Sequence, residues 1–275
     1  MLISRFLKTK LAVIGGIIVL VVVFASIAAD WISPHDPFRI DAAVRLSKPS
    51  RTYLFGTDEF GRDIFSRVIH GSRISLQVGF ISCITSLVLG TLIGAFAGYF
   101  GGIVDNILMR IIDSIWSVPY VLLTIVLVAM LGHGLTNVMI AIGIAYTPPV
   151  SRITRSLVLE ERENLYVEAA RAIGKSGLRI LFSEILPNCL NGIIVYGTVV
   201  FADAIIIESG LSFIGLGAQP PTSSWGVMLK NGVSFMQHHP FIVLFPALAI
   251  SLSTLGFNML GDGLRDLFDP KLRRM

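Results

Sequence analysis

The chain has 275 residues, of which 53% are hydrophobic and only 15% are charged, and its mean hydropathy is +0.76. A soluble domain carries about 25% charged residues because its surface must be wetted, so this composition excludes an ordinary soluble domain. The net charge of +4 is too weak to indicate nucleic-acid binding. The two cysteines, Cys83 and Cys189, form no spacing pattern, so neither a disulfide framework nor a metal site is indicated.

The first apolar block covers residues 11–29 and contains no charged residue. Crossing a hydrocarbon core of about 30 Å takes about 20 apolar residues in a helix, so this block is long enough to span it. Arg5, Lys8 and Lys10 precede the block, as in a signal peptide, but the apolar part of a signal peptide has only about 7–15 residues. We therefore predict a cytoplasmic N-terminus over 1–10 and an uncleaved first transmembrane helix over 11–29.

Five further apolar blocks follow, and because lipid offers backbone groups no hydrogen bonds, all of them must be helices. They cover residues 74–100, 111–131, 135–150, 190–214 and 241–260. The Gly132–His133–Gly134 turn makes the third and fourth helices an antiparallel hairpin, and Thr147–Pro148–Pro149 must bend or end the fourth helix. The prediction is an all-α integral membrane protein with about six transmembrane helices.

Lys and Arg residues set the orientation, because loops that stay in the cytoplasm carry an excess of them. With six spans, one side holds the N-terminus, the loop around Arg110, segment 151–189 and the C-terminus, and together these carry most of the 22 basic residues. That side is therefore predicted to be cytoplasmic, with a C-terminal tail over 262–275. Loop 30–73 is predicted to be extracytoplasmic, although it is itself basic. Residues 74–261 would form a five-helix core that includes segment 151–189.

Small residues recur at every fourth position of the second block, at Ser82, Ser86, Gly90, Gly94 and Gly98. Such a stripe lets two helix backbones approach each other closely in lipid, where packing drives helix association. We interpret this stripe as a packing face within one helix bundle, in preference to an interface between two subunits.

Segment 151–189 is too polar for the membrane, yet its pattern predicts ordered helices. Leu165, Ala169 and Ile173 are spaced four apart, which indicates one face of a helix. Tyr166 and Ala170 lie beside them on that face. Gly174 would end that helix. Ser176 would then cap a second helix through 178–186 that ends at Pro187. A small-residue face at the tip of a loop suits insertion into a partner's cleft.

This segment resembles the EAA signature of ABC importer permeases. The resemblance rests on Glu168–Ala169–Ala170, Gly174 and Ile185–Leu186–Pro187, and it departs at Glu184, where the signature has an apolar residue. In that family the loop is a coupling helix that docks in a groove of the ATPase subunit. The resemblance therefore implies an ATPase-coupling role for Tyr166, Glu168, Ala169, Ala170, Gly174, Lys175, Leu186 and Pro187.

Three further groups of strings resemble the DppC/OppC-like subunit of dipeptide and oligopeptide permeases, whose relatives include nickel and glutathione permeases. They are Gly56–Thr57–Asp58 with Gly61–Arg62–Asp63 and Ser66–Arg67; Glu208–Ser209 with 211–217, Gln219–Pro220–Pro221 and Trp225–Gly226; and Phe257–Asn258 with Gly261–Asp262, 264–266 and Asp269–Pro270. The resemblance implies the fold of a type I ABC importer transmembrane domain.

The function implied by this resemblance is that of a permease subunit forming half of a pathway for short peptides, in the inner membrane of a bacterium or archaeon. Its partners would be a homologous second permease subunit, two ABC ATPase subunits and an extracytoplasmic substrate-binding protein. The chain would hold no cofactor, since ATP and Mg would bind the partner ATPases. The alternatives are a permease for nickel, a metal chelate or glutathione and, from another class, a secondary transporter, which usually shows inverted repeats not seen here.

Three polar features allow competing interpretations. Gly174–Lys175–Ser176 looks like the end of a phosphate-binding loop, but that loop needs a glycine where Ala169 stands, so we expect neither an ATPase site nor enzyme activity. Asp203 and Glu208 lie in the fifth block, where a lone charge is costly; they either line the substrate pathway or make polar contacts between helices. Interfacial rather than metal-binding positions are expected for His133, His238 and His239.

Overall fold

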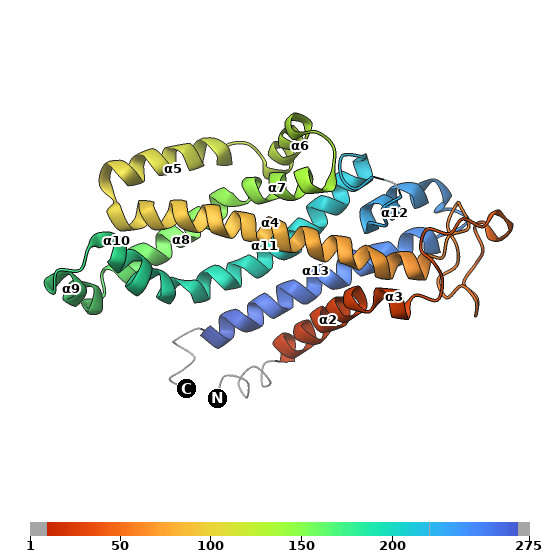
Figure 1. Cartoon of the computed structure of the whole chain (residues 1–275), viewed down its shortest axis with the longest axis horizontal. Coiled ribbons are helices and arrows are strands. Elements are labelled where there is room, and N and C mark those ends of the chain that lie inside the picture. Colours follow the sequence, from red (N-terminus) through yellow and green to blue (C-terminus); the bar gives the residue numbers. More distant parts are fainter. Residues whose placement is uncertain (1–9, 220, 269–275) are drawn as a thin grey trace.

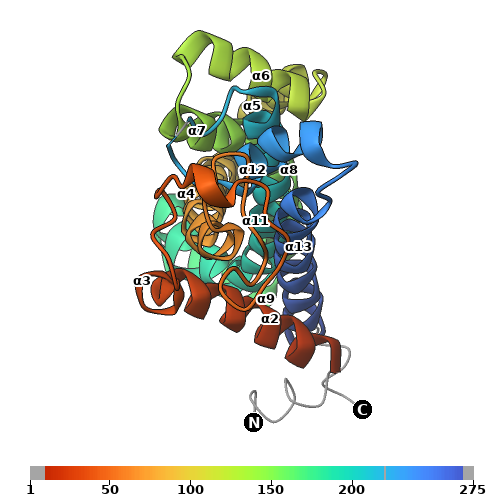
Figure 2. The same ribbon diagram turned by 90° about the vertical axis from the view of Figure 1, so that its right-hand side faces the viewer.

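Helices lie side by side along the long axis of the molecule in the computed structural model, which describes residues 10–219 and 221–268 (Figures 1 and 2). Within those residues the regular structure is helical, apart from one isolated β-bridge in the loop before α4. The parts of the sequence predictions that fall on 1–9, on Pro220 and on 269–275 lie outside the described residues.

Four helical stretches are long and apolar enough to cross a membrane. They are α2 (Lys10–Ile27), α4 (Ile64–Phe100), the run Gly177–Ile214 and α13 (Phe241–Phe268). The run comprises α10 (Gly177–Ile180), a π-helical turn η2 (Leu181–Ile185) and α11 (Leu186–Ile214). A fifth span results if a bent pair is counted as one, namely α5 (Gly102–Trp116) and α6 (Tyr120–Leu131), which meet at 89°. The other elements are α3 (Ala29–Ile32), η1 (Ala42–Val44), α7 (Leu135–Ala145), α8 (Thr147–Arg162), α9 (Leu165–Ala172), α12 (Trp225–Gly232) and η3 (Val233–Phe235).

The predicted span 135–150 is divided between two helices. α7 ends at Ala145, and α8 begins at Thr147 with proline in its first turn, where the missing amide hydrogen is tolerated. With 11 residues, α7 is too short to cross a bilayer alone. Length and composition therefore support four or five spans, and the number six stays a prediction.

Two helix boundaries differ from the sequence prediction. α4 begins at Ile64 rather than near residue 74, because Asp63 caps it by accepting a hydrogen bond from the backbone amide three residues on. Several polar residues of its first turns are buried by the preceding loop, so hydropathy alone does not reveal them as helix. The predicted span 111–131 is broken before Pro119, which cannot continue α5 and stands as the N-terminal cap of α6.

The small-residue stripe of α4 packs against α7 and α8. A side-chain carbon added at Gly94 would lie 2.2 Å from the backbone oxygen of Ser151, and one added at Gly90 would also collide with α8. The Ser82 hydroxyl donates a hydrogen bond of 2.9 Å to the backbone oxygen of Met139 in α7. The interpretation of the stripe as a packing face within one bundle is confirmed.

Gly94→Ala should destabilise the bundle, because α4 and α8 would have to move apart to admit one methyl group. Overpacking of this kind costs about 1–3 kcal/mol. Gly210→Ala is the matched control: it replaces another helical glycine, yet nothing lies within 4 Å of the added carbon, and alanine is favoured in helices by up to about 1 kcal/mol. Thermal unfolding in detergent should give a lower midpoint for Gly94→Ala only, and equal midpoints for the two variants would contradict the packing.

The two ends of the long axis carry different elements (Figure 1). α9 and α10 lie at one end, whereas the loop before α4 and α12 lie at the other. α2 starts near the middle of the long axis and runs away from the α9 end, and α13 runs back toward that end. The last described helix therefore ends on the side of the bundle that carries α9.

Candidate functional site

α9 presents an apolar stripe to solvent at the end of the molecule. Leu165 and Ile173 are 81% and 74% exposed, and both Ala169 between them and the neighbouring Glu168 are exposed as well. Leu165 and Ala169 share one face of α9, and Ile173, at the C-cap, continues the same four-residue spacing. Contiguous exposed apolar side chains are typical of surfaces that bind a protein, a membrane or a ligand.

The opposite face of α9 holds this helix against the bundle. Val167 and Ala170 are buried in an apolar cluster that also contains Ile180, Leu181 and Ile185. The sequence pattern places Ala170 beside the exposed stripe, but the structure gives it a packing position instead. Because such interiors are close-packed, a displacement of α9 must move α10 and the start of α11 with it.

Three side-chain contacts fix the geometry of this loop. The Tyr166 hydroxyl donates to the Glu161 carboxylate at 2.6 Å and accepts from the Asn188 amide at 3.2 Å. Burial and the bond to Glu161 raise the pKa of Tyr166 to about 12, so the hydroxyl keeps the proton that it donates. Lys175 donates a hydrogen bond of 2.6 Å to the Glu184 carboxylate. Glu184 stands where the EAA signature has an apolar residue, and this bond explains how the loop accommodates a carboxylate there.

A glycine is required at the turn after α9, and the second predicted helix starts after Ser176 as expected but does not end at Pro187. Gly174 has φ of +80°, which L side chains rarely adopt, and it ends α9 as predicted. Ser176 holds the N-cap position of α10 (Gly177–Ile180), although its side chain makes no capping hydrogen bond. Pro187 is exposed in the first turn of α11, beside the half-buried Leu186, and a π-helical turn precedes it, so the helix continues to Ile214.

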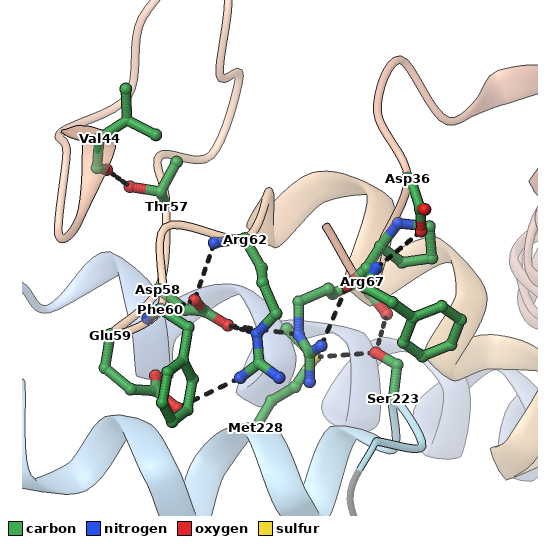
Figure 3. Close-up of polar contacts among 12 residues, drawn as sticks. Asp36, Val44, Thr57, Asp58, Glu59, Phe60, Arg62, Arg67, Ser223 and Met228 are labelled. Carbon is green, nitrogen blue, oxygen red and sulfur yellow. Dashed lines mark hydrogen bonds and ion pairs between the residues drawn. The ribbon is translucent and has the colours of Figure 1, made fainter. Parts of the chain in front are cut away.

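At the other end of the molecule, buried ion pairs hold the loop before α4 (Figure 3). Arg62 donates to the Asp58 carboxylate at 2.7 Å, and Arg67 donates to the backbone oxygen of Pro37 at 3.1 Å. The Ser223 hydroxyl, just before α12, donates to the backbone oxygen of Arg67 at 2.8 Å although 156 positions separate them. This cluster therefore joins the first loop to the segment that leads into α12.

The Gly–Arg–Asp string of that loop needs its glycine for a close approach. Gly61 has φ of +76°, and a side-chain carbon there would lie 1.8 Å from the backbone oxygen of Asp41. Trp225 also depends on a glycine, because its indole ring lies directly over Gly71, where a side chain would collide with it. The indole N–H donates a hydrogen bond of 2.8 Å to the backbone oxygen of Val68. Strings from the first two of the three groups that resemble the peptide-permease family thus contact one another at this end.

Asp203 borders a cavity of about 280 Å³ between α5, α6, α7, α8 and α11. The Tyr146 hydroxyl donates to Oδ2 of Asp203 at 3.0 Å. Trp116, Tyr120 and Tyr196 also line the cavity. The sequence analysis did not identify these aromatic residues as candidates for the site. The sequence does show that they lie in apolar blocks, and that Trp116, Tyr120 and Tyr146 lie close to the prolines that interrupt the helices.

Glu208 is fully buried and does not border that cavity. Its Oε1 accepts hydrogen bonds from the hydroxyls of Ser212 at 2.6 Å and Ser224 at 3.0 Å. The Ala218 amide in turn donates to the Ser212 hydroxyl oxygen at 2.9 Å. Glu208 therefore joins the end of α11 to the next turn and to α12, which favours the helix-contact alternative for this residue.

The chain matches two families of transport proteins. Residues 90–274 match the family described as binding-protein-dependent transport system inner membrane component. Residues 1–49 match the family described as N-terminal TM domain of oligopeptide transport permease C.

Curated relatives match over nearly the whole chain. The dipeptide transport system permease protein DppC of Alkalihalophilus pseudofirmus is 45% identical over 266 residues, which cover 97% of this chain and 88% of that protein. The DppC protein of Bacillus subtilis is 41% identical over 271 residues, covering 98% and 85%. The glutathione transport system permease protein GsiD of Pectobacterium atrosepticum is 42% identical over 270 residues, covering 98% and 90%.

A solved structure shares the fold. A chain of the MetNI methionine ABC transporter, in an inward-facing conformation, has a TM-score of 0.61 and 19% identity, and the match covers 75% of this chain and 98% of that one. The likeness supports the type I ABC importer fold that the sequence predicts. The chain is therefore a multi-pass membrane protein that belongs to the binding-protein-dependent transport system inner membrane component family.

Proposed function

We propose that this chain is the permease subunit of an ATP-driven importer of short peptides and forms half of its translocation pathway. The proposal rests on the exposed stripe of Leu165, Ala169 and Ile173. The opposite face of α9 is packed against the bundle, so a partner bound to the stripe could transmit its movement to the bundle. Relatives named as dipeptide permeases, at 41% and 45% identity, support the choice of substrate.

The partners follow from this assignment. α9 docks on one of two ATPase subunits, which bind ATP and Mg, and this chain holds no cofactor of its own. When the ATPases close, α9 moves, and the buried cluster around Ala170 passes the movement to the run Gly177–Ile214. A homologous second permease completes the pathway. Both termini and α9 lie in the cytoplasm, and a binding protein delivers substrate at the opposite end.

The test is reconstitution of the complete complex in proteoliposomes, with uptake of labelled dipeptides, longer peptides and nickel measured in parallel. We expect dipeptide uptake that requires both ATP and the binding protein. Uptake that proceeds without ATP would overturn the proposal in favour of a secondary transporter. ATP-dependent uptake of nickel without any peptide uptake would keep the importer and overturn the substrate.

Glutathione is a second candidate substrate, because a relative 42% identical over 270 residues is named as a glutathione permease. Glutathione is itself a modified tripeptide, so the same assay separates the two. Faster uptake of glutathione than of dipeptides at equal concentration would favour this second candidate.

A further inference from the structure

The cavity beside Asp203 lies where two consecutive pairs of helices are interrupted. The 89° corner between α5 and α6 and the break between α7 and α8 both border it. Non-helical backbone at membrane depth is tolerated only where it is buried in protein or lines a water-filled space. Two interruptions that meet at one cavity therefore favour a chamber that water can enter.

The chamber combines one carboxylate with several aromatic side chains. Asp203 is the one charged residue among those that line it. Its Oδ2 accepts the Tyr146 hydroxyl, which leaves Oδ1 without a hydrogen-bond partner among the described residues. The Tyr120 and Tyr146 rings lie 5.5 Å apart, and Trp116 and Tyr196 complete the aromatic lining. A carboxylate among aromatic faces attracts an organic cation by charge and by cation–π contact.

We infer that this chamber binds the free amino-terminal ammonium group of a short peptide during translocation, an inference that rests on the proposed function. The volume of about 280 Å³ is just below the roughly 300–1,000 Å³ of ordinary ligand pockets, so it suits the amino-terminal end and not a whole oligopeptide. A metal ion fits less well, because among the described residues no three His, Cys, Asp or Glu side chains are grouped to hold one.

The test uses the complete complex in lipid nanodiscs without the binding protein, so that selection by that protein does not contribute. A dipeptide carrying a photoreactive side chain is offered with a free or an N-acetylated amino terminus, and labelled positions are mapped by mass spectrometry. We expect the free peptide to label the chamber residues about tenfold more than the acetylated one, the effect of roughly one ionic contact. Asp203→Asn should lower labelling by the free peptide to the acetylated level.

Asp262→Asn is the matched control, because it neutralises an exposed carboxylate on α13 and should leave the labelling ratio unchanged. Equal labelling by the two peptides in the unaltered complex overturns the inference, and this comparison does not depend on whether any variant folds. An unchanged ratio in a folded Asp203→Asn complex overturns it as well. ATP-driven uptake by the unaltered complex is measured separately, so that loss of the labelling preference alone leaves the proposed function standing.

Discussion

Ile173→Glu is expected to abolish ATP-driven peptide uptake while leaving the protein folded in the membrane. The side chain is 74% exposed and lies outside the buried cluster of the loop, so folding should change by no more than about 0.5 kcal/mol. In the docked complex, however, a carboxylate would be desolvated in an apolar contact without a partner. That costs several kcal/mol, and every 1.4 kcal/mol lowers the affinity about tenfold.

The measurements are ATP-dependent uptake in proteoliposomes and co-purification of the ATPase subunits. Both should fall sharply for Ile173→Glu, and Ala169→Arg on the same stripe should behave alike. Glu163→Arg is the control, because it also changes the charge of an exposed residue near α9 but does not touch the stripe. Normal uptake by Ile173→Glu, or equal losses in it and in the control, would contradict docking through this stripe.

The loop that carries α9 was predictable because its signals are local. A four-residue apolar spacing and one glycine with positive φ define α9 and its end, and both act over a few residues of chain. The side of the helix that faces outward was harder to predict. Ala170 adjoins the stripe in sequence, yet it is buried because Ile180 and Ile185 come back to cover it, which depends on how the chain folds after the turn.

The boundaries and partners that could not be predicted depend on distant residues. Polar residues in the first turns of α4 are buried, and Ser223 hydrogen-bonds to the backbone there, so hydropathy alone does not identify these turns as helix. Asp203 was visible in the sequence as a charge in an apolar block, but its partner Tyr146 is 57 positions away on another helix. The break before Pro119 was visible in principle, because the residue before a proline is disfavoured in a helix.

Glu208→Ala is expected to lower the stability of the protein by about 2–5 kcal/mol. The substitution would leave the buried hydroxyls of Ser212 and Ser224 without their acceptor and open a cavity at the junction of α11 and α12. Glu208→Gln keeps an acceptor oxygen of nearly the same shape, so its loss should be much smaller. Thermal unfolding in detergent, read by tryptophan fluorescence, should place the Gln variant between the unaltered protein and the Ala variant.

The same pair of variants separates a structural role for Glu208 from a place in the substrate pathway. If the carboxylate only ties α11 to α12, Glu208→Gln should retain nearly normal peptide uptake, whereas Glu208→Ala should lose uptake together with its folded population. Asp203→Asn should show the reverse pattern, with a small change in unfolding midpoint and a large change in peptide labelling, because Asp203 borders a cavity and is only half-buried. Loss of uptake in a Glu208→Gln protein with an unchanged midpoint would instead assign Glu208 to the pathway.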